Sequence, residues 1–295
     1  MEIKKIAVIG AGVMGHGIAR LFLTSGFNVN LVDSNSTGLE KGLQAIKKEI
    51  ERHLVARGKI SEADATAMLG RLQGFNKLED AVSDSDLVIE AIFEDLDVKK
   101  KLFSDLERLC PVHTILASNT STLSITGIAG ATESSEKVIG MHFFNPPDVF
   151  RLLEIDPGLE TAEDTVTIVT DLAKKMKMVP LRVKDTPAFV INIFVRAFFA
   201  EAVTLIQNGI ASAETIDIGM RTAFGMGTGP CETMDLTGLE LISTIIKNDQ
   251  KYSHLYLIES MVEAGRIGVK NGKGFYDYLP DGTKKLADLS NVVGS

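Results

Sequence analysis

The chain has 295 residues, of which 45% are hydrophobic and 24% are charged, as in a globular protein long enough for two domains. The formal net charge of -8 and the lack of a run of Lys and Arg argue against nucleic acid as a partner. Cys110 and Cys231 stand far apart, so the sequence predicts neither a disulfide framework nor a metal site.

We expect the protein to be cytoplasmic. A predicted strand begins close to the N-terminus and leaves no room for a signal peptide. No apolar run approaches the roughly 18 charge-free residues that a membrane helix needs, so we expect no membrane partner.

A glycine-rich turn follows the first predicted strand, Ile6 to Ile9, and precedes a predicted helix. It reads Gly10-Ala11-Gly12-Val13-Met14-Gly15. In a dinucleotide site, the first glycine allows a tight turn, the second lets the backbone approach the pyrophosphate, and the third lets the helix pack on the strand. The helix N-terminus adds N–H donors for the phosphates. We therefore predict a dinucleotide site here; the alternative is a turn that binds nothing.

Asp33 stands at the end of the second predicted strand, Val29 to Val32. An acid at this distance from the glycines can accept hydrogen bonds from both ribose hydroxyls and repels a 2′-phosphate. The sequence therefore predicts NAD rather than NADP.

A long amphipathic helix from Ser36 to about Arg57, and another that begins at Ser61, exceed what a simple crossover needs. This pair could form an arm for a bulky substrate, with Arg52, Arg57 and Lys59 available for phosphate. The equally reasonable alternative is a solvated face.

Two further strands are predicted at Leu87 to Ala91 and Thr114 to Ala117, with a helix from Leu96 to Leu109 between them. Glu94 and Ser121 follow these strands, and His142 ends the next one. In a parallel sheet the ligand lies at the carboxyl ends of the strands, so we expect these three side chains to converge. Ser121 could instead be only a turn residue, and no GxSxG pattern marks it as a nucleophile.

The stretch VIGMHFFNPPDVFRLLEI is the predicted centre of the chemistry. His142 lies where a strand gives way to a loop, and Glu154 lies in a second apolar run where a carboxylate needs a partner. An imidazole is a suitable partner because the anion stabilises the protonated ring and fixes its tautomer, as an acid or base near neutral pH requires. The alternative is a structural histidine.

The pattern changes after Lys184-Asp185-Thr186-Pro187, which we interpret as a domain boundary. Before it lie a helix, Thr161 to Met178, and a last strand, Val179 to Val183. After it, helical patterns cover Phe189 to Gln207, Ala213 to Phe224, Leu236 to Asn248 and His254 to Ala264. The predicted domains are residues 1–184, a doubly wound, mostly parallel α/β sheet with a helical arm; 185–280, an all-helical domain; and 281–295, a tail.

The chain resembles the L-3-hydroxyacyl-CoA dehydrogenase family, and within it the stand-alone 3-hydroxybutyryl-CoA dehydrogenases, over about residues 3 to 279. The matching stretches are GAGVMG, VIEAIFED with Lys99, SNTSTL, GMHFFNP, the apolar helix with Asn192, and GVKNGKGFYDY. The resemblance implies an NAD-dependent oxidoreductase of fatty acid or butanoate metabolism. It also implies an acyl-CoA substrate and a homodimer formed through the second domain.

The resemblance also implies roles for single residues. His142 is the general base on the substrate 3-hydroxyl, Glu154 pairs with it, and Ser121 and Asn192 hydrogen-bond the substrate oxygen. The positions near the nicotinamide and its ribose are Glu94, Lys99, Ser121 and Asn145. Lys270 matches a position further along the cofactor.

The chain departs from the family pattern after Asn192, where Ile193 replaces the Arg of many relatives. This change bears on how the second domain packs over the substrate and hence on acyl-chain length. Two rival functions stay open. One is the same chemistry on a free hydroxy acid such as a sugar acid, and the other is a non-catalytic NAD-binding protein.

Overall fold

The computed structural model describes residues 1–186, 189–247 and 249–289, which form two compact units. The first unit is Met1–Phe189 and the second begins at Val190. This division lies a few residues beyond the boundary predicted after Lys184, and Pro187 of that predicted boundary falls outside the described residues.

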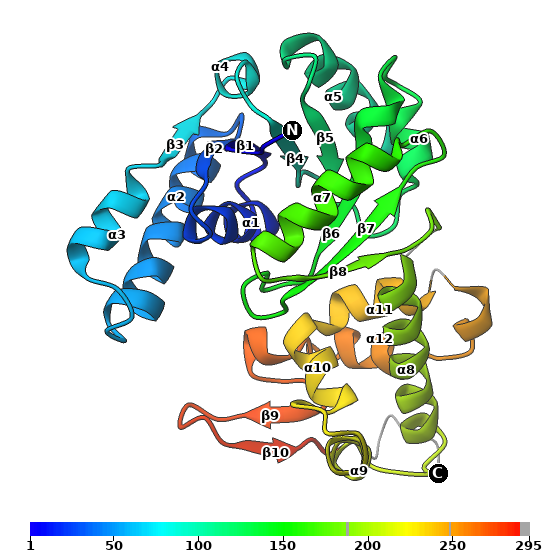
Figure 1. Ribbon diagram of the computed structural model, residues 1–295. Coiled ribbons are helices and arrows are strands. Elements are labelled where there is room, and N and C mark those ends of the chain that lie inside the picture. The colour runs from blue at the N-terminus through cyan, green and yellow to red at the C-terminus, as the bar shows by residue number, and fades with distance from the viewer. Residues whose placement is uncertain (187–188, 248, 290–295) are drawn as a thin grey trace. The chain divides into compact units, whose positions relative to one another are not determined.

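The first unit is built on an eight-stranded sheet (Figure 1). Its strands in spatial order are β3 (Leu72–Phe75), β2 (Asn28–Val32), β1 (Lys5–Ile9), β4 (Leu87–Glu90), β5 (Ile115–Ser118), β6 (Val138–Phe143), β7 (Leu152–Pro157) and β8 (Val179–Arg182). The strands pair in parallel except β6 and β7, which are antiparallel. The strand order reverses between β1 and β4, and this confirms the predicted doubly wound sheet.

Helices cover both faces of this sheet. They are α1 (Val13–Thr24), α2 (Ser36–Ile50), α3 (Glu62–Leu69), α4 (Leu78–Val82), α5 (Leu96–Leu109), α6 (Ile125–Ala129) and α7 (Glu163–Lys175). Apolar side chains of α1, α2 and α7 pack on one face, and those of α4, α5 and α6 pack on the other. Because both faces are covered, a central strand such as β4 is buried along its whole length, which explains why its first three residues, Leu87 to Ile89, are all apolar.

The predicted helical arm consists of α2, one turn of π-helix (Glu51–Val55) and α3. Ser61 begins α3 as predicted: its Oγ accepts a hydrogen bond from the Asp64 N–H, and the Asp64 carboxylate accepts one from the Ser61 N–H. The chain then returns to the sheet as β3, which the sequence did not predict. The reason is that Gln73 and Gly74 are exposed and interrupt the apolar run.

The second unit is helical, as predicted. Its helices are α8 (Phe189–Gln207), α9 (Ala213–Phe224), α10 (Pro230–Thr237), α11 (Leu239–Lys247) and α12 (Leu257–Glu263). The helix predicted from Leu236 to Asn248 corresponds to α11 but begins three residues later, at Leu239. Gly238 adopts a φ of 100° and separates α10 from α11, and Asn248 lies outside the described residues. By length and composition α8 could cross a membrane, and 33% of its most apolar window is buried.

The second unit also contains a β-hairpin, so the prediction of an all-helical domain followed by a tail was incomplete. Strand β9 (Tyr276–Tyr278) pairs with β10 (Lys284–Leu286), so part of 281–295 is ordered, while 290–295 lie outside the described residues. The turn contains Asp281 and Gly282, the latter with a φ of 83°. This Asp-Gly pair is a hairpin signal that the sequence interpretation missed.

Candidate active site

The carboxyl ends of β4, β5 and β6 bring three predicted side chains together. The Ser121 Oγ lies 3.1 Å from His142 Nε2, and the Ser121 N–H donates to Glu94 Oε1 at 3.1 Å. The three strands are neighbours in the sheet, which is why residues so far apart in sequence meet at one edge.

His142 and Glu154 form a buried pair across the antiparallel strands β6 and β7. They are directly opposite in register, and His142 Nδ1 lies 2.8 Å from Glu154 Oε2. Glu154 has no exposed surface and His142 is 4% exposed. Because a carboxylate only accepts, Nδ1 carries the hydrogen, and Nε2 of the neutral ring is left as the acceptor that faces Ser121.

Two aromatic side chains fix the imidazole plane of His142. The ring centroid of Phe144 lies 4.6 Å from that of His142, and the centroid of Phe189 lies 5.5 Å away. The ring therefore has little freedom to rotate away from Glu154.

A buried ion-pair network supports the loop that carries Ser121. The Lys99 ammonium lies 2.5 Å from Glu90 Oε1 and 3.2 Å from Glu94 Oε2, and it is 1% exposed. Although burial works in the opposite direction, hydrogen bonds from Thr120 and the charge of Lys99 hold the pKa of Glu94 below its ordinary value. Glu94 is thus a carboxylate that orders the backbone of the loop after β5.

Sequence interpretation missed Glu90 and Thr120. Glu90 accepts hydrogen bonds from the Ser118 hydroxyl at 2.7 Å and the Ile92 N–H at 2.7 Å, besides its ion pair with Lys99. An acid at the end of an apolar run was a usable signal, because such a group needs a buried cation.

A cavity of about 370 Å³ lies at the glycine turn. It is lined by Ala11, Gly12, Val13, His16, Asp33, Gly38, Lys41, Gly42 and Ala45. Of the predicted cofactor residues, Ala11, Gly12, Val13 and Asp33 belong to this lining. Those outside it are Gly10, Met14, Gly15, Glu94, Lys99, Ser121, Asn145 and Lys270. His16 and Lys41 are lining residues that the sequence interpretation did not single out.

The glycines of the turn fit a dinucleotide. Gly10 has a φ of 98°, and a Cβ on Gly15 would lie 1.7 Å from the Gly10 carbonyl oxygen, so both positions require glycine. A Cβ on Gly12 would meet nothing within 4 Å, which leaves open space over the first turn of α1. The first N–H groups of a helix have no acceptor within the helix, so those of this turn suit a phosphate.

Asp33 lies at the wall of this cavity. Its Oδ2 accepts the Ala11 N–H at 2.9 Å and its Oδ1 accepts the Asn35 N–H at 2.9 Å. Each carboxylate oxygen keeps a second lone pair, so both can still accept a ribose hydroxyl.

The remaining predicted site residues belong to other segments. Asn145 is exposed in the loop after β6. Asn192 and Lys270 belong to the second unit, where Asn192 is half-buried on α8 and the Lys270 ammonium lies 3.7 Å from a Glu240 oxygen.

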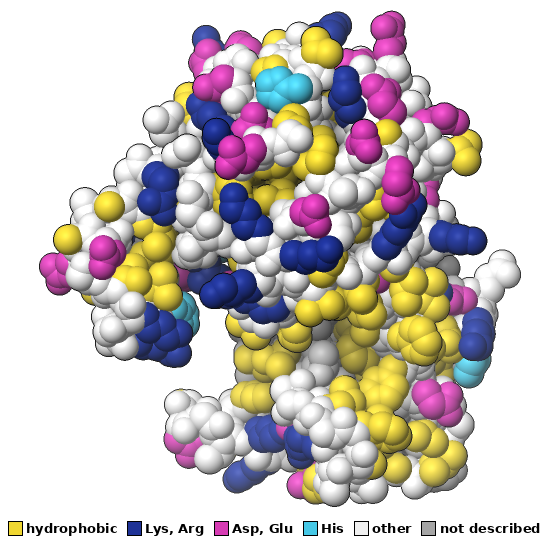
Figure 2. Space-filling model, viewed as in Figure 1, with side chains coloured by type: hydrophobic (Ala, Val, Ile, Leu, Met, Phe, Trp, Pro, Cys, Tyr) yellow, Lys and Arg dark blue, Asp and Glu magenta, His cyan; other side chains and the backbone are white. Residues whose placement is uncertain are grey.

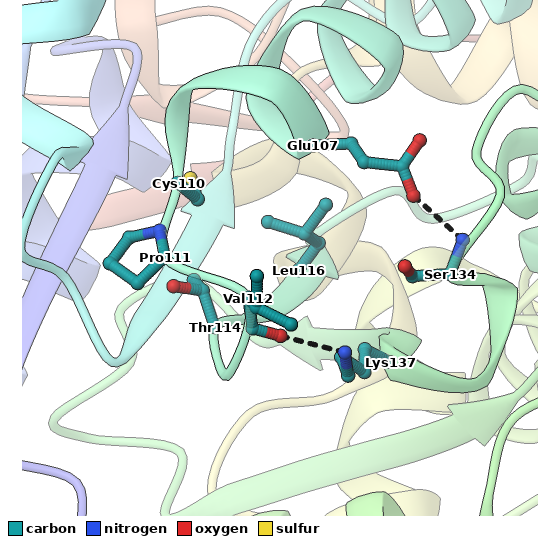
Figure 3. Close-up of a pocket in the computed structure, with 8 residues that line it drawn as sticks. All are labelled: Glu107, Cys110, Pro111, Val112, Thr114, Leu116, Ser134 and Lys137. Atoms are coloured by element: carbon teal, nitrogen blue, oxygen red, sulfur yellow. Dashed lines mark hydrogen bonds between the residues drawn. The ribbon is translucent and has the colours of Figure 1, made fainter.

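A second cavity, of about 80 Å³, lies beside the amino-terminal end of β5 (Figure 3). Burial raises the pKa of its Cys110 thiol to about 12, so the thiol stays protonated and unreactive. The Glu107 carboxylate accepts the Ser134 N–H, and the Lys137 ammonium donates to the Val112 carbonyl. Both charged side chains of this cavity are therefore engaged with backbone groups.

Comparisons with known proteins identify the family of this chain. The family model described as 3-hydroxyacyl-CoA dehydrogenase, NAD binding domain, matches residues 5–186, and the model of the C-terminal domain matches residues 189–278. The chain is 41% identical over 284 residues to a probable 3-hydroxybutyryl-CoA dehydrogenase of Bacillus subtilis, covering 94% of this chain and 98% of the relative.

Two further relatives agree. The chain is 39% identical over 280 residues to the 3-hydroxybutyryl-CoA dehydrogenase of Clostridioides difficile, covering 93% of this chain and 99% of the relative. The crystal structure of (S)-3-hydroxybutyryl-CoA dehydrogenase from Ralstonia eutropha matches with a TM-score of 0.86 at 35% identity, covering 94% of this chain and 100% of that chain. The chain therefore belongs to the 3-hydroxyacyl-CoA dehydrogenase family, which confirms the predicted enzyme class and its NAD cofactor.

Proposed function

We propose that this enzyme oxidises short-chain L-3-hydroxyacyl-CoA to 3-ketoacyl-CoA and catalyses the reverse reduction of acetoacetyl-CoA. The observation that carries the proposal is the buried His142–Glu154 pair, with Nδ1 and the carboxylate 2.8 Å apart, at the strand ends of an NAD-binding domain. Relatives named for 3-hydroxybutyryl-CoA support the short acyl chain.

The proton transfer is assigned to His142. In oxidation its Nε2 takes the substrate hydroxyl proton, and in reduction the imidazolium returns it. Glu154 stabilises the imidazolium and holds Nε2 toward the crevice. The Ser121 hydroxyl, 3.1 Å from Nε2, is placed to hydrogen-bond the same substrate oxygen, and Asn192 is proposed as its second donor.

Bound NAD supplies the chemistry of hydride acceptance and donation. The residues proposed to hold it are Gly10, Ala11, Gly12, Val13, Met14, Gly15, Asp33, Glu94, Lys99, Ser121, Asn145 and Lys270. Lys99 is 1% exposed and paired with Glu90 and Glu94, so its contribution is to position Glu94 and the loop of Ser121.

The arm is proposed to receive the CoA part of the substrate. Arg52, Arg57 and Lys59 are exposed near its end, where basic side chains gather in Figure 2. Cationic side chains on an exposed arm suit the phosphates of CoA, which a free hydroxy acid lacks.

A homodimer formed through the second unit is also proposed, with the enzyme in the cytoplasm. Hydrophobic side chains gather over α8 and its neighbours (Figure 2), and Phe194 and Phe224 are 72% and 73% exposed. A second copy covers such a patch better than lipid does, because Arg196 on the same helix forms an ion pair with Asp249. The free Cys110 and Cys231 thiols suit a reducing compartment.

The function is tested by following NADH oxidation with acetoacetyl-CoA, with longer 3-ketoacyl-CoAs and with free acetoacetate. The proposal expects the highest kcat/KM for acetoacetyl-CoA and inhibition by free CoA. A preference for the free acid would favour the hydroxy-acid alternative, and NADH binding without turnover would favour the non-catalytic one.

Replacing Asp33 with Ala together with Ser34 with Arg is expected to relax the preference for NAD. The change removes the hydrogen-bond acceptor for the ribose and supplies a cation for a 2′-phosphate at an exposed position. The ratio of kcat/KM for NADPH to that for NADH should rise by about tenfold or more. An unchanged ratio would refute the role of Asp33, and Ser34→Arg alone controls for the added charge.

Replacing Glu154 with Gln is expected to move the acid limb of the pH–rate profile for hydroxyacyl-CoA oxidation to lower pH. The buried imidazolium of His142 loses the only carboxylate that directly contacts it among the described side chains, so the neutral, active ring persists to lower pH. The limb is read from kcat/KM between about pH 5 and pH 8. A limb that stays in place would mean that the pair does not carry the proton transfer.

A further inference from the structure

A buried arginine lies outside the chemistry described above. Arg20 of α1 is 7% exposed, and its guanidinium joins carboxylates from two distant segments. Nη1 lies 2.8 Å from Glu49 Oε2, near the end of α2, and Nη2 lies 2.7 Å from Asp148 Oδ1, in the loop between β6 and β7. Its Nε is buried without a hydrogen-bond partner among the described residues. Burying a charge with an unsatisfied N–H costs free energy, so stability alone explains the arrangement poorly.

The loop that Arg20 holds is residues 144–151, which directly follow β6 and its His142. Pro147 is buried against α1, where a Cβ added to Gly17 would lie 3.1 Å from the Pro147 Cδ. At the start of the loop, the Phe144 ring packs on the imidazole of His142, with centroids 4.6 Å apart. The position of the loop therefore decides how firmly one side of the imidazole is held.

Both helices that Arg20 joins also line the cofactor cavity. Val13 and His16 of α1 line it, as do four residues of α2: Gly38, Lys41, Gly42 and Ala45. Arg20 follows His16 by about one helical turn on α1, and Glu49 follows Ala45 by about one turn on α2. One guanidinium thus connects the walls of the cavity with the loop that packs on His142.

We propose that Arg20 is a positioning residue: by bridging Glu49 and Asp148 it holds loop 144–151 against α1 and keeps Phe144 packed on His142. It acts through the loop and touches no reacting atom. This inference rests on the proposed function, in which the orientation of His142 limits proton transfer.

The test compares Arg20→Gln with Arg182→Gln. Arg182 is a matched control because it also makes two hydrogen bonds to a carboxylate, at 2.6 and 2.9 Å from Glu163, but on an exposed surface. For each variant, kcat and KM are measured with acetoacetyl-CoA, the Kd for NADH by fluorescence titration, and amide hydrogen exchange by mass spectrometry, all well below the unfolding temperature.

Arg20→Gln is expected to lower kcat by about tenfold or more, to leave the Kd for NADH within about twofold, and to speed exchange selectively in loop 144–151. Arg182→Gln should match the wild type in all three. Asp148→Asn keeps the Arg20–Glu49 pair. It should reproduce the lower kcat and the faster exchange of loop 144–151, even if Arg20→Gln folds poorly. Arg20→Lys should give an intermediate kcat, because an ammonium keeps the charge but cannot span both carboxylates as the planar fork does.

A wild-type kcat in Arg20→Gln and Asp148→Asn would overturn the proposal. Faster amide exchange spread evenly over the first unit in Arg20→Gln would also overturn it, because that result is expected of an arginine that only stabilises the fold. If the wild type itself does not reduce acetoacetyl-CoA, the proposed function fails, and the loop exchange still decides whether Arg20 holds the loop.

Discussion

Replacing His142 with Gln is expected to lower kcat for acetoacetyl-CoA reduction by about 10² to 10⁴ while leaving NADH affinity nearly intact. The loss equals the usual contribution of a general acid or base. NADH affinity survives because the cavity at the glycine turn is lined by residues of other segments, including Gly12 and Asp33, and not by His142. The fold survives because Gln can still donate to the buried Glu154 carboxylate.

Steady-state reduction of acetoacetyl-CoA and fluorescence titration with NADH on one preparation test this expectation. His113→Gln is the matched control, because His113 is also paired with a carboxylate but at an exposed position: its Nε2 lies 3.2 Å from an Asp86 oxygen. This control should keep wild-type kinetics. If His142→Gln retains more than about a tenth of kcat, His142 is structural and the proposed mechanism is wrong.

The elements with strong local patterns could be predicted from the sequence. The glycine turn, the buried strands around it and α5 needed only the spacing of apolar residues and glycines. The spacing of His142 and Glu154 made their pairing reasonable, but it could not give the antiparallel register that places them directly opposite each other. That register requires β6 and β7 to be neighbours in the sheet, and a local sequence pattern cannot predict which strands are neighbours.

Contacts between distant segments were not predictable in the same way. Arg20 lies within the apolar run Ile18 to Leu23 of α1, and its partner Asp148 is 128 residues away. The buried pair of Lys99 with Glu90 joins a helix to a strand end, and neither residue alone indicates the other. Short elements such as β3 were missed because exposed residues interrupt the pattern and the neighbouring strand supplies the stability.

Asp156, on β7 two residues beyond Glu154, is a buried acid that the sequence interpretation also passed over. It has no exposed surface, and neither of its carboxyl oxygens has a hydrogen-bond partner among the described residues. Burial, followed by the negative charges of Glu154 and Asp185, raises the pKa of Asp156 from its ordinary 3.8 to about 8. At neutral pH the folded protein therefore keeps this carboxyl protonated.

The shift makes Asp156 destabilising in a defined pH window. Below about pH 4 the carboxyl is protonated in both the folded and the unfolded chain and has no effect. As the pH rises from there to about 8, the unfolded chain ionises while the folded protein keeps the proton, so the free energy of unfolding falls. The full difference corresponds to an upper limit of roughly 6 kcal/mol, which is large beside the usual stability of a domain.

Asp156→Asn is therefore expected to stabilise the protein, and increasingly so as the pH rises, because the amide has the shape of the carboxyl but does not titrate. Urea unfolding at about pH 5 and about pH 8 should show the gain in free energy growing by roughly 3 kcal/mol between the two. Asp185→Asn is the control, because it is expected to change the free energy of unfolding in the opposite direction. Although burial opposes the change, hydrogen bonds from Thr126, Ile125 and Ser124 hold the pKa of Asp185 below its ordinary value, so its loss should destabilise the protein at neutral pH. If Asp156→Asn raises the free energy of unfolding equally at both pH values, the pKa of Asp156 is not raised in the folded protein. The expectation is then wrong.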